Sequence, residues 1–284
     1  GKLYAFLCKA KDDLRIDYRI MEFFSVINKF LKQEPESRRR NLYIRTYAVT
    51  PLNENSGIIE WIENLSTLRS ILVKYYSERG VSSVTSSEWK QHEERINKDK
   101  EYALKVFKMF VERYKPTVLY EWFLRSFPEP NSWYNARSNY VRTAAVMSVC
   151  GYVIGLGDRH CENITMASSN GDCIHVDFNC LFNKGETLGV PEIVPFRLTH
   201  NMIEAMGPLG FEGIYRKTCE VTLKILRDYR EPLITILKTF IYDPLVEWKT
   251  PSNYKSYESG ETVSAKVSHL THPVLLCSLF CLHF

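Results

Sequence analysis

The segment from Gly155 to Phe178, GLGDRHCENITMASSNGDCIHVDF, constrains this chain more than any other part of it. Within it, two short apolar runs flank a polar stretch that contains Asn170 and Gly171. Asn-Gly between two such runs is the strongest short hairpin signal, because both residues tolerate the positive φ of a tight turn. We therefore predict a β-hairpin with Asn170 and Gly171 as its two loop residues, and with Asn163 facing Phe178 at its open end.

The polar residues of this segment gather at the open end of the predicted hairpin. Asn163 and Asp177 would lie together there, where one Mg²⁺ could take an oxygen from each. Asp158 precedes Asn163 by five residues, in the loop that enters the same end. Metal-dependent phosphoryl transfer needs a carboxylate near the attacking hydroxyl, two oxygen ligands on the metal and a donor for the phosphate, here His160. Any one of these residues could be a turn former or a cap, but the combination is specific.

Composition limits the class of protein further. The chain has 284 residues, 45% of them hydrophobic, which is enough for one large or two modest domains. Its formal charge of +4 is weak and spread out, so we expect no direct nucleic-acid binding. The apolar run 273–284 is too short to cross a bilayer, and we expect no membrane association. The eight cysteines contain no paired CxxC motif, which indicates reduced thiols, no zinc, and a cytosolic or nuclear compartment.

Sequence patterns predict a small α+β lobe followed by a mainly helical region. Apolar periodicity, β-branched enrichment and turn residues carry this prediction. In chain order we expect a strand over 4–9, a helix from a cap at Asp12 or Asp13 to about Leu31, a strand over 42–49 closed by Pro51, and an apolar connector over 58–62. Beyond Leu65 we expect an exposed polar segment over 82–100, a buried helix over 137–155, and two helices within 212–248 that are broken near Pro232.

Three residues outside the hairpin are candidates for nucleotide binding. Lys9 ends the first predicted strand, from which it could reach phosphates, and Asp17, one turn into the helix, is the acid that we expect to hold it. Trp61 lies where the two parts of the chain join, and could form an apolar wall of an adenine pocket. Taken alone, Lys9 could equally be a surface residue without a ligand, and Trp61 could equally be an ordinary core residue.

Several stretches resemble the kinase domain of the phosphatidylinositol 3-kinase-related protein kinases. They are KAKDDLRID, YAVTPLNENSGIIEW, GLGDRHCENI, HVDFN and VPEIVPFRLTHNM, and the resemblance covers about residues 1–248. HVDFNCLFNKGE and PFRLTHNM are most similar to the checkpoint-kinase branch of this family. The resemblance implies a bilobal, protein-kinase-like α+β fold, with ATP and Mg²⁺ as cofactors and Mn²⁺ as an alternative metal. It also implies Ser/Thr-Gln protein substrates, a regulatory protein that binds these checkpoint kinases, and a nuclear location.

The same resemblance implies a role for each candidate residue. It implies that Lys9 contacts the ATP phosphates with the help of Asp17, and that the hinge to adenine is formed by Glu60, Trp61 and Ile62. It implies that Asp158 orients or deprotonates the substrate hydroxyl, that His160 supports the transferring phosphate, and that Mg²⁺ is held by Asn163 and Asp177. The activation segment would comprise residues 179 to 195, and Pro195-Phe196-Arg197 would close it.

The expected domain organisation departs from the family pattern at both ends. We expect residues 1–60 to form a partial small lobe without its first strands and without the loop that covers the phosphates. Residues 61–250 would form the hinge and the large lobe, and 251–284 a divergent tail without a recognisable C-terminal domain of the family. Cys161 also stands where a small residue such as Gly is common. The alternative from another class is therefore a truncated, inactive nucleotide-binding or scaffold fragment.

A phosphoinositide lipid kinase is the rival within enzymes, because such kinases share the D-R-H-x-x-N motif. An anionic lipid headgroup requires several Lys or Arg residues in the activation segment. Residues 179–194 contain a single lysine, Lys184, against Glu186 and Glu192. This balance favours a protein substrate over a lipid.

Overall fold

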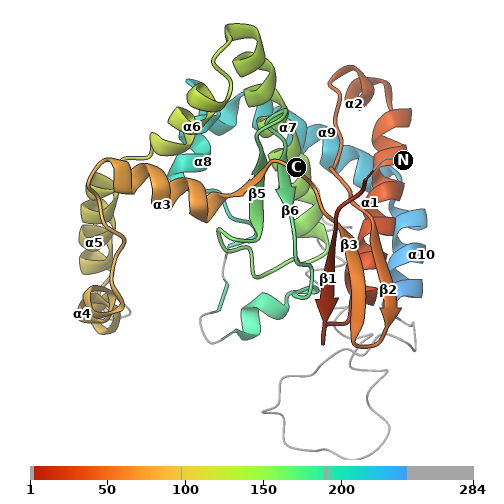
Figure 1. The fold of residues 1–284 in the computed structure, drawn as a ribbon, viewed down its shortest axis with the longest axis horizontal. Helices are drawn as coiled ribbons and strands as arrows, with labels where there is room; N and C mark the ends of the chain where they lie inside the picture. The colour runs from red at the N-terminus through yellow and green to blue at the C-terminus, as the bar shows by residue number, and fades with distance from the viewer. Residues whose placement is uncertain (1–2, 97, 189–190, 193, 242–284) are drawn as a thin grey trace, which may run out of the picture.

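The computed structural model describes residues 3–96, 98–188, 191–192 and 194–241 of the chain. It contains a small antiparallel sheet near the N-terminus and a larger, mainly helical region (Figure 1). The predicted divergent tail, 251–284, lies outside the described residues. In chain order the elements are β1 (Phe6–Ala10), α1 (Arg15–Gln33), α2 (Pro35–Arg39), β2 (Val49–Asn53), β3 (Ser56–Glu60), β4 (Leu65–Thr67), α3 (Leu68–Glu78), α4 (Ser86–Ile96), α5 (Lys100–Arg113), α6 (Val118–Ser126), α7 (Pro130–Val153), β5 (Ile164–Ala167), β6 (Cys173–His175), the 3-10 helix η1 (Lys184–Thr187), α8 (His200–Ala205), the 3-10 helix η2 (Gly210–Glu212), α9 (Ile214–Asp228) and α10 (Arg230–Ile241).

The first sheet has the strand order β1-β3-β2, with β3 in the centre. β3 is antiparallel to both neighbours, and Ile58 takes part in both pairings. The predicted connector over 58–62 is therefore wrong in its first half, because the strand continues through Glu60 and the connector begins at Trp61. In the central position, the backbone groups of this apolar stretch find hydrogen-bond partners on both sides.

The segment 42–49, predicted to be a strand, has no strand pairing within the described residues before Val49, where β2 begins. Asn28 of α1 explains the difference. Its side-chain amide donates to the carbonyl of Ile44 and accepts from the N–H of Ile44, both at 2.8 Å. One side chain thus takes the hydrogen bonds that a neighbouring strand would have supplied. β2 then runs through Pro51, which was predicted to end a strand, and which is tolerated because β2 is an outer strand of the sheet.

The start of α1 also differs from the prediction. The helix begins at Arg15, and its N-cap residue Leu14 makes no side-chain cap, so capping by Asp12 or Asp13 is wrong. Asp13 accepts hydrogen bonds from the backbone and the side chain of Arg15, and Asp12 pairs with Lys9. Both acids are therefore engaged by cations close to them in the sequence.

Two hydrophobic cores hold the chain together, and α7 belongs to both of them. The first core joins Ile20, Phe24 and Ile27 of α1 to side chains of α7, α9 and α10. The second core joins α3, α6 and α8 to α7 and to the β5–β6 hairpin. The buried helix predicted over 137–155 is confirmed as part of α7, which begins earlier, at Pro130. Because α7 is shared, residues far apart in the sequence are fixed relative to one another around it.

The remaining helices follow the predicted pattern. The polar segment 82–100 contains α4, which lies with α5 as an arm at the side away from the first sheet (Figure 1). α9 and α10 are separated at Tyr229, and Pro232 lies in the first turn of α10, where proline costs little. Among the described residues, no helix combines the length and the apolarity that a bilayer crossing requires.

Asn28→Ala should lower the free energy of unfolding by about 2 kcal/mol, because the buried peptide group of Ile44 would lose both of its partners. Urea unfolding followed by circular dichroism measures this loss. The exposed neighbour Lys29→Ala serves as the control and should leave the midpoint nearly unchanged. Equal midpoints for the two variants would show that water replaces the amide without cost.

Candidate active site

The β5–β6 hairpin forms as predicted, but its register differs by two residues. Ile164 lies opposite His175, whereas the predicted pairing placed Asp177 there. The turn contains four residues instead of two: the N–H of Gly171 donates to the carbonyl of Ala167 at 2.8 Å. A shift of two residues leaves every side chain on its predicted face, because the strand period is two.

The open end of the hairpin still brings Asn163 beside Asp177. The N–H of Val176 donates to the carbonyl of Asn163 at 3.1 Å, so Asn163 faces the residue before Asp177. The side-chain nitrogen of Asn163 donates to the carbonyl of Asp158 at 2.9 Å. This bond closes the loop between Asp158 and Asn163, and it engages the nitrogen of the Asn163 amide rather than the oxygen.

Buried Arg159, the arginine of the D-R-H motif, to which the sequence analysis gave no role, connects this loop to the segment after β6. Its guanidinium donates to the carbonyls of Gly157, Val176 and Asp177. Burial lowers the pKa of Arg159, while the nearby carboxylates of Asp177 and Asp158 act in the opposite direction. Its position inside the D-R-H motif was the only signal in the sequence, and it did not indicate which backbone groups the arginine would bind.

Two oxygens at this end are free to bind a metal. The amide of Asn163 donates through its nitrogen, which leaves Oδ1 without a hydrogen bond in the described part of the chain. Asp177 accepts from Asn179 through Oδ1, which leaves Oδ2. The described residues hold no cluster of three or more His, Cys, Asp or Glu side chains suited to a metal. One amide and one carboxylate fit Mg²⁺, which keeps few protein ligands and completes its shell with phosphate oxygens and water.

Lys9 pairs with Asp12, and not with the predicted Asp17; the distance from Nζ to Oδ2 is 3.0 Å. Partial burial acts to lower the pKa of Lys9, but the hydrogen bond to Asp12 and the charges of Asp12, Asp17 and Asp177 raise it overall. The lysine is therefore a stable cation in an acidic surrounding. Asp12 was read as a cap because it precedes a helix, and sequence spacing alone could not separate it from Asp17.

Asp17 instead lies buried under the residue that follows Asp177. Its Oδ1 accepts the N–H of Phe178 at 3.3 Å, and its Oδ2 is buried without a hydrogen-bond partner. Burial raises the pKa of Asp17 to about 6, against the opposing effects of the Phe178 bond and of Lys9. Asp17 thus ties α1 to the Asp177 segment through the backbone, while Lys9 is close enough to act on its charge.

The predicted hinge lies between β3 and β4. The N–H groups of Glu60 and Trp61 donate to the carbonyls of Ala48 and Ala5. The N–H of Ile62 donates to none of the described residues, which leaves it available to a ligand. Trp61 is 55% exposed, so it is a surface residue in the structure and not part of the core.

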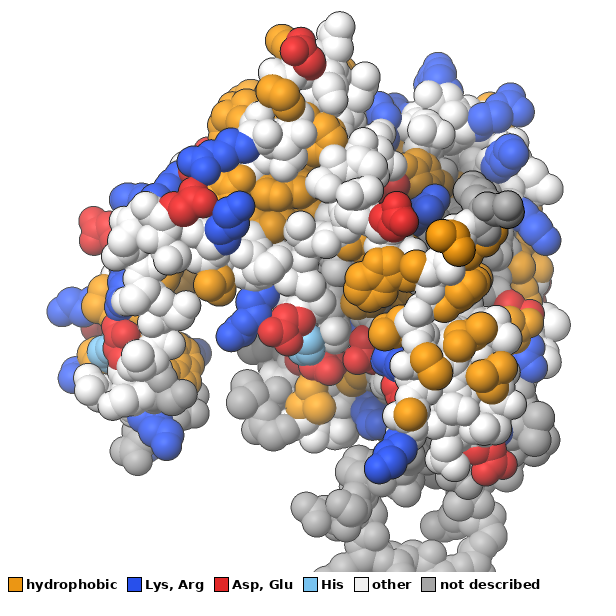
Figure 2. Space-filling model, in the orientation of Figure 1, with side chains coloured by type: hydrophobic (Ala, Val, Ile, Leu, Met, Phe, Trp, Pro, Cys, Tyr) orange, Lys and Arg blue, Asp and Glu red, His pale blue; other side chains and the backbone are white. Residues whose placement is uncertain are grey.

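His160 belongs to the same loop as Asp158 and is exposed, and its Nδ1 accepts the N–H of Glu162 at 3.2 Å. Figure 2 shows acidic and histidine side chains gathered in the hollow between the α4–α5 arm and the sheet that contains β1. The hydrogen bonds of Asn163 to the carbonyls of Asp158 and His160, and of Val176 to Asn163, bring Asp158, His160, Asn163 and Asp177 to one end of the hairpin.

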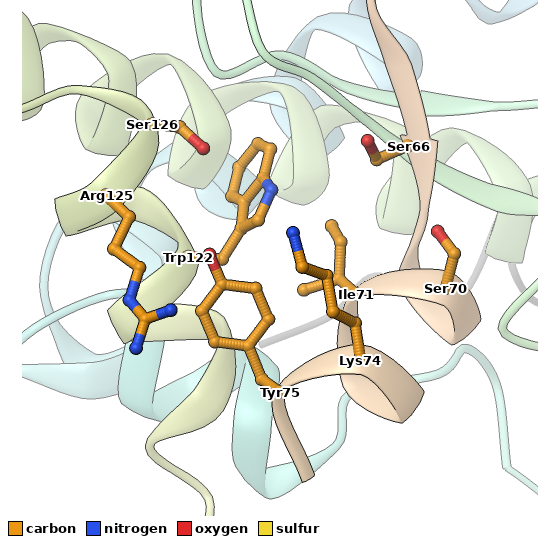
Figure 3. Close-up of a pocket in the computed structure, with 8 residues that line it drawn as sticks. All are labelled: Ser66, Ser70, Ile71, Lys74, Tyr75, Trp122, Arg125 and Ser126. Atoms are coloured by element: carbon orange, nitrogen blue, oxygen red, sulfur yellow. The ribbon is translucent and has the colours of Figure 1, made fainter. Parts of the chain in front are cut away.

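A separate pocket of about 380 Å³ lies between α3 and α6 (Figure 3). It contains none of the predicted site residues. Arg125 borders this pocket, and its guanidinium is already paired with Glu78 and Glu121. A second pocket, of about 350 Å³, includes Asp12 and Asn179 and so borders the candidate site.

The family model of phosphatidylinositol 3- and 4-kinase matches residues 3–250. The chain belongs to this family. Protein kinase rad3 of Schizosaccharomyces pombe is 49% identical over 272 residues, which are 93% of this chain and 11% of rad3. Serine/threonine-protein kinase ATR of Arabidopsis thaliana is 50% identical over 253 residues, which are 87% of this chain and 9% of that protein. The chain thus spans about a tenth of the length of these relatives.

A solved structure described as the FAT and kinase domain of CtTel1 matches the fold with a TM-score of 0.80 at 33% identity. The match covers 98% of this chain and 19% of that one. The predicted bilobal α+β kinase fold is confirmed. The predicted resemblance to the checkpoint branch is confirmed as well, because the relatives above are named ATR and rad3.

The buried carboxyl of Asp17 should make stability depend on pH. Because its pKa is raised from 3.8 to about 6, the folded chain keeps this proton where the unfolded chain has lost it, and stability falls as pH rises through that window. Asp17→Asn removes the effect, so relative to the wild type the variant should gain roughly 2 to 3 kcal/mol between pH 4 and pH 7.

Urea unfolding of both proteins at pH 4, 5, 6 and 7 tests this. Glu54→Gln, at an exposed acid of the β2–β3 turn, is the control and should show no comparable change across the window. A stability difference between Asp17→Asn and the wild type that stays constant with pH would mean that Asp17 is already ionised in the folded chain.

Proposed function

We propose that this chain is the catalytic domain of an ATR-type serine/threonine protein kinase, which transfers the γ-phosphate of ATP to protein hydroxyls. One observation carries the proposal: the side chain of Asn163 is bonded to the carbonyl of Asp158 at the end of the hairpin where Asp177 lies. Asp158, the candidate base, and Asn163, a candidate metal ligand, thus belong to one closed loop, and Asp177, the second candidate ligand, lies in the segment beside it. The names of the ATR and rad3 relatives support the same reading.

The chain's own residues divide the chemistry as follows. Asp158 accepts or orients the proton of the attacking hydroxyl, and His160 donates to the transferring phosphate from the exposed side of the loop. Asn163 and Asp177 each present one oxygen to a divalent cation. When bound, Mg²⁺ neutralises the phosphate charge that develops during transfer, and Mn²⁺ would serve by the same ligands.

The nucleotide lies between the sheet and this loop in the proposal. Lys9, held by Asp12, contacts the phosphates, and Asp17 keeps the Asp177 segment beside it through Phe178. Adenine would lie on the hinge of Glu60, Trp61 and Ile62. Ile62 offers an N–H that donates to none of the described residues, whereas the other two N–H groups are taken by the protein.

Substrate class follows from the charge of the activation segment. Lys184 is exposed, and two acids of the same segment, Glu186 and Glu192, offset it. Phosphoinositide headgroups require a cationic surface, so a protein hydroxyl is the favoured acceptor. The resemblance to ATR adds Ser/Thr-Gln sites, an ATR-interacting regulatory protein as partner, checkpoint signalling in response to DNA damage, and the nucleus as location.

The remaining candidate is a nucleotide-binding scaffold without catalysis. A decayed site is expected to have lost some of the residues that bind phosphate and metal. Here Lys9, Asp158, Asn163 and Asp177 are all present, and the Asn163–Asp158 bond is made. We therefore favour an active kinase.

Asp177→Ala should abolish phosphotransfer, because it removes one of the two protein oxygens proposed for the metal. The assay is transfer of radiolabelled γ-phosphate to a Ser-Gln peptide, with the protein as expressed from its gene. The melting temperature should change by only a few degrees, since Asp177 is partly exposed. The exposed Glu101→Ala should retain activity, and an active Asp177→Ala enzyme would remove this residue from the metal site.

The wild-type protein should label Ser-Gln peptides and leave phosphatidylinositol vesicles unlabelled. Replacing the exposed Glu186 by Lys would test the charge argument, because it should raise vesicle binding without creating lipid phosphorylation. Efficient phosphatidylinositol labelling by the wild type would favour a lipid kinase over a protein kinase.

A further inference from the structure

Glu192 occupies an unusual position beside the candidate base. Both oxygens of its carboxylate accept the backbone N–H of Asp158, at 3.0 and 2.9 Å. Glu192 is 34 residues away from Asp158 in the chain and lies beyond Asp177. Its own N–H donates to the carbonyl of Gly185 at 3.1 Å. A side chain from the activation segment therefore fixes the backbone of the catalytic loop.

Two glycines make room for this carboxylate. A Cβ at Gly157 would lie 2.6 Å from Oε2 of Glu192, and a Cβ at Gly185 would overlap the same oxygen. The φ of Gly157 and of Gly185 lies outside the left-handed range, so neither position needs glycine for its backbone conformation. The contacts therefore explain the glycine at position 185: a larger residue there would occupy the space of the Glu192 carboxylate.

The held residue is the one whose backbone needs support. Asp158 has φ +56°, in the left-handed region that non-glycine residues rarely adopt. Such a conformation is strained and persists where its surroundings determine it. The bond to Glu192 and the bond from Asn163 to the carbonyl of Asp158 act on the two sides of this residue.

We propose that Glu192 is a positioning residue for Asp158: its carboxylate, seated on Gly157 and Gly185, holds the Asp158 backbone so that the side chain points at the substrate hydroxyl. This inference rests on the proposed role of Asp158 as the base. Glu192 itself touches neither nucleotide nor peptide in the proposal. Its loss should therefore affect the rate of transfer and spare nucleotide binding, because misplacement of a reacting group costs rate.

The first test compares three substitutions at one position, in the protein as expressed from its gene. Glu192→Ala should lower kcat for a Ser-Gln peptide roughly 10- to 100-fold, with KM for ATP within about twofold of the wild type. Glu192→Gln keeps one acceptor oxygen and should recover most of the rate, whereas Glu192→Leu should not. The exposed Glu204→Ala is the control and should behave as the wild type.

The second test uses the glycine seat. Gly185→Ala should by itself lower kcat, because the added methyl displaces the carboxylate. In Glu192→Ala the seat is empty, so adding Gly185→Ala should cause little further loss. A purely structural role for each residue would instead multiply the two losses. Strong non-additivity in kcat, with unchanged ATP-dependent thermal shifts, is the expected result.

The outcomes separate this inference from the proposed function. If Asp158→Ala abolishes transfer while Glu192→Ala keeps the wild-type kcat, the positioning role is wrong and the kinase assignment stands. Parallel losses of kcat, ATP affinity and melting temperature in Glu192→Ala and Glu192→Gln alike would also overturn it, as would multiplicative losses in the double variant. If Asp158→Ala remains active, both proposals fall together.

Discussion

The buried guanidinium of Arg159 is the interaction on which the rest of the site depends. A buried cation needs a full set of acceptors, and Arg159 finds them in backbone carbonyls on both sides of the site. Since those carbonyls belong to the loop before the hairpin and to the residues after it, the loop of Asp158 and the segment of Asp177 cannot move independently. Arg197 adds a further bond, to the carbonyl of Arg159 itself. Because these acceptors are backbone carbonyls, Arg159 does not take up the carboxylates of Asp158 and Asp177.

The two acids that this clamp places share a strained backbone. Asp158 and Asp177 have φ of +56° and +60°, and aspartate is among the residues that tolerate this region best. A left-handed residue turns the chain sharply, so that its side chain can project from a loop while its backbone stays bonded to the protein. The surrounding hydrogen bonds offset the strain, which is why so much of the site's bonding is directed at peptide groups.

Sequence patterns predicted what depends on local order and missed what depends on distant contacts. Turn chemistry and periodicity predict the hairpin at Asn170-Gly171, the helix α7 and the position of the four polar residues at the hairpin's open end. The strand expected over 42–49 failed because Asn28 of another element takes its hydrogen bonds. The predicted partner of Lys9 was also wrong. Spacing along the chain does not separate Asp12 from Asp17, and only the fold shows that Asp12 is partly exposed beside Lys9 whereas Asp17 is buried.

The tip of the β5–β6 hairpin rests on α7, and this restricts how the chain can be altered. A Cβ at Gly171 would meet the carbonyl oxygen of Ala136 at 2.4 Å, and Asn139 donates to the carbonyl of Asn170. Hairpin tips are ordinarily the places where insertions, affinity tags and fluorescent labels are accommodated. Here an insertion would lift the hairpin from its support and tilt the end that holds Asn163 with it. The exposed turn after α3, at Gly80, where a Cβ would meet nothing within 4 Å, is the better place for a reporter group.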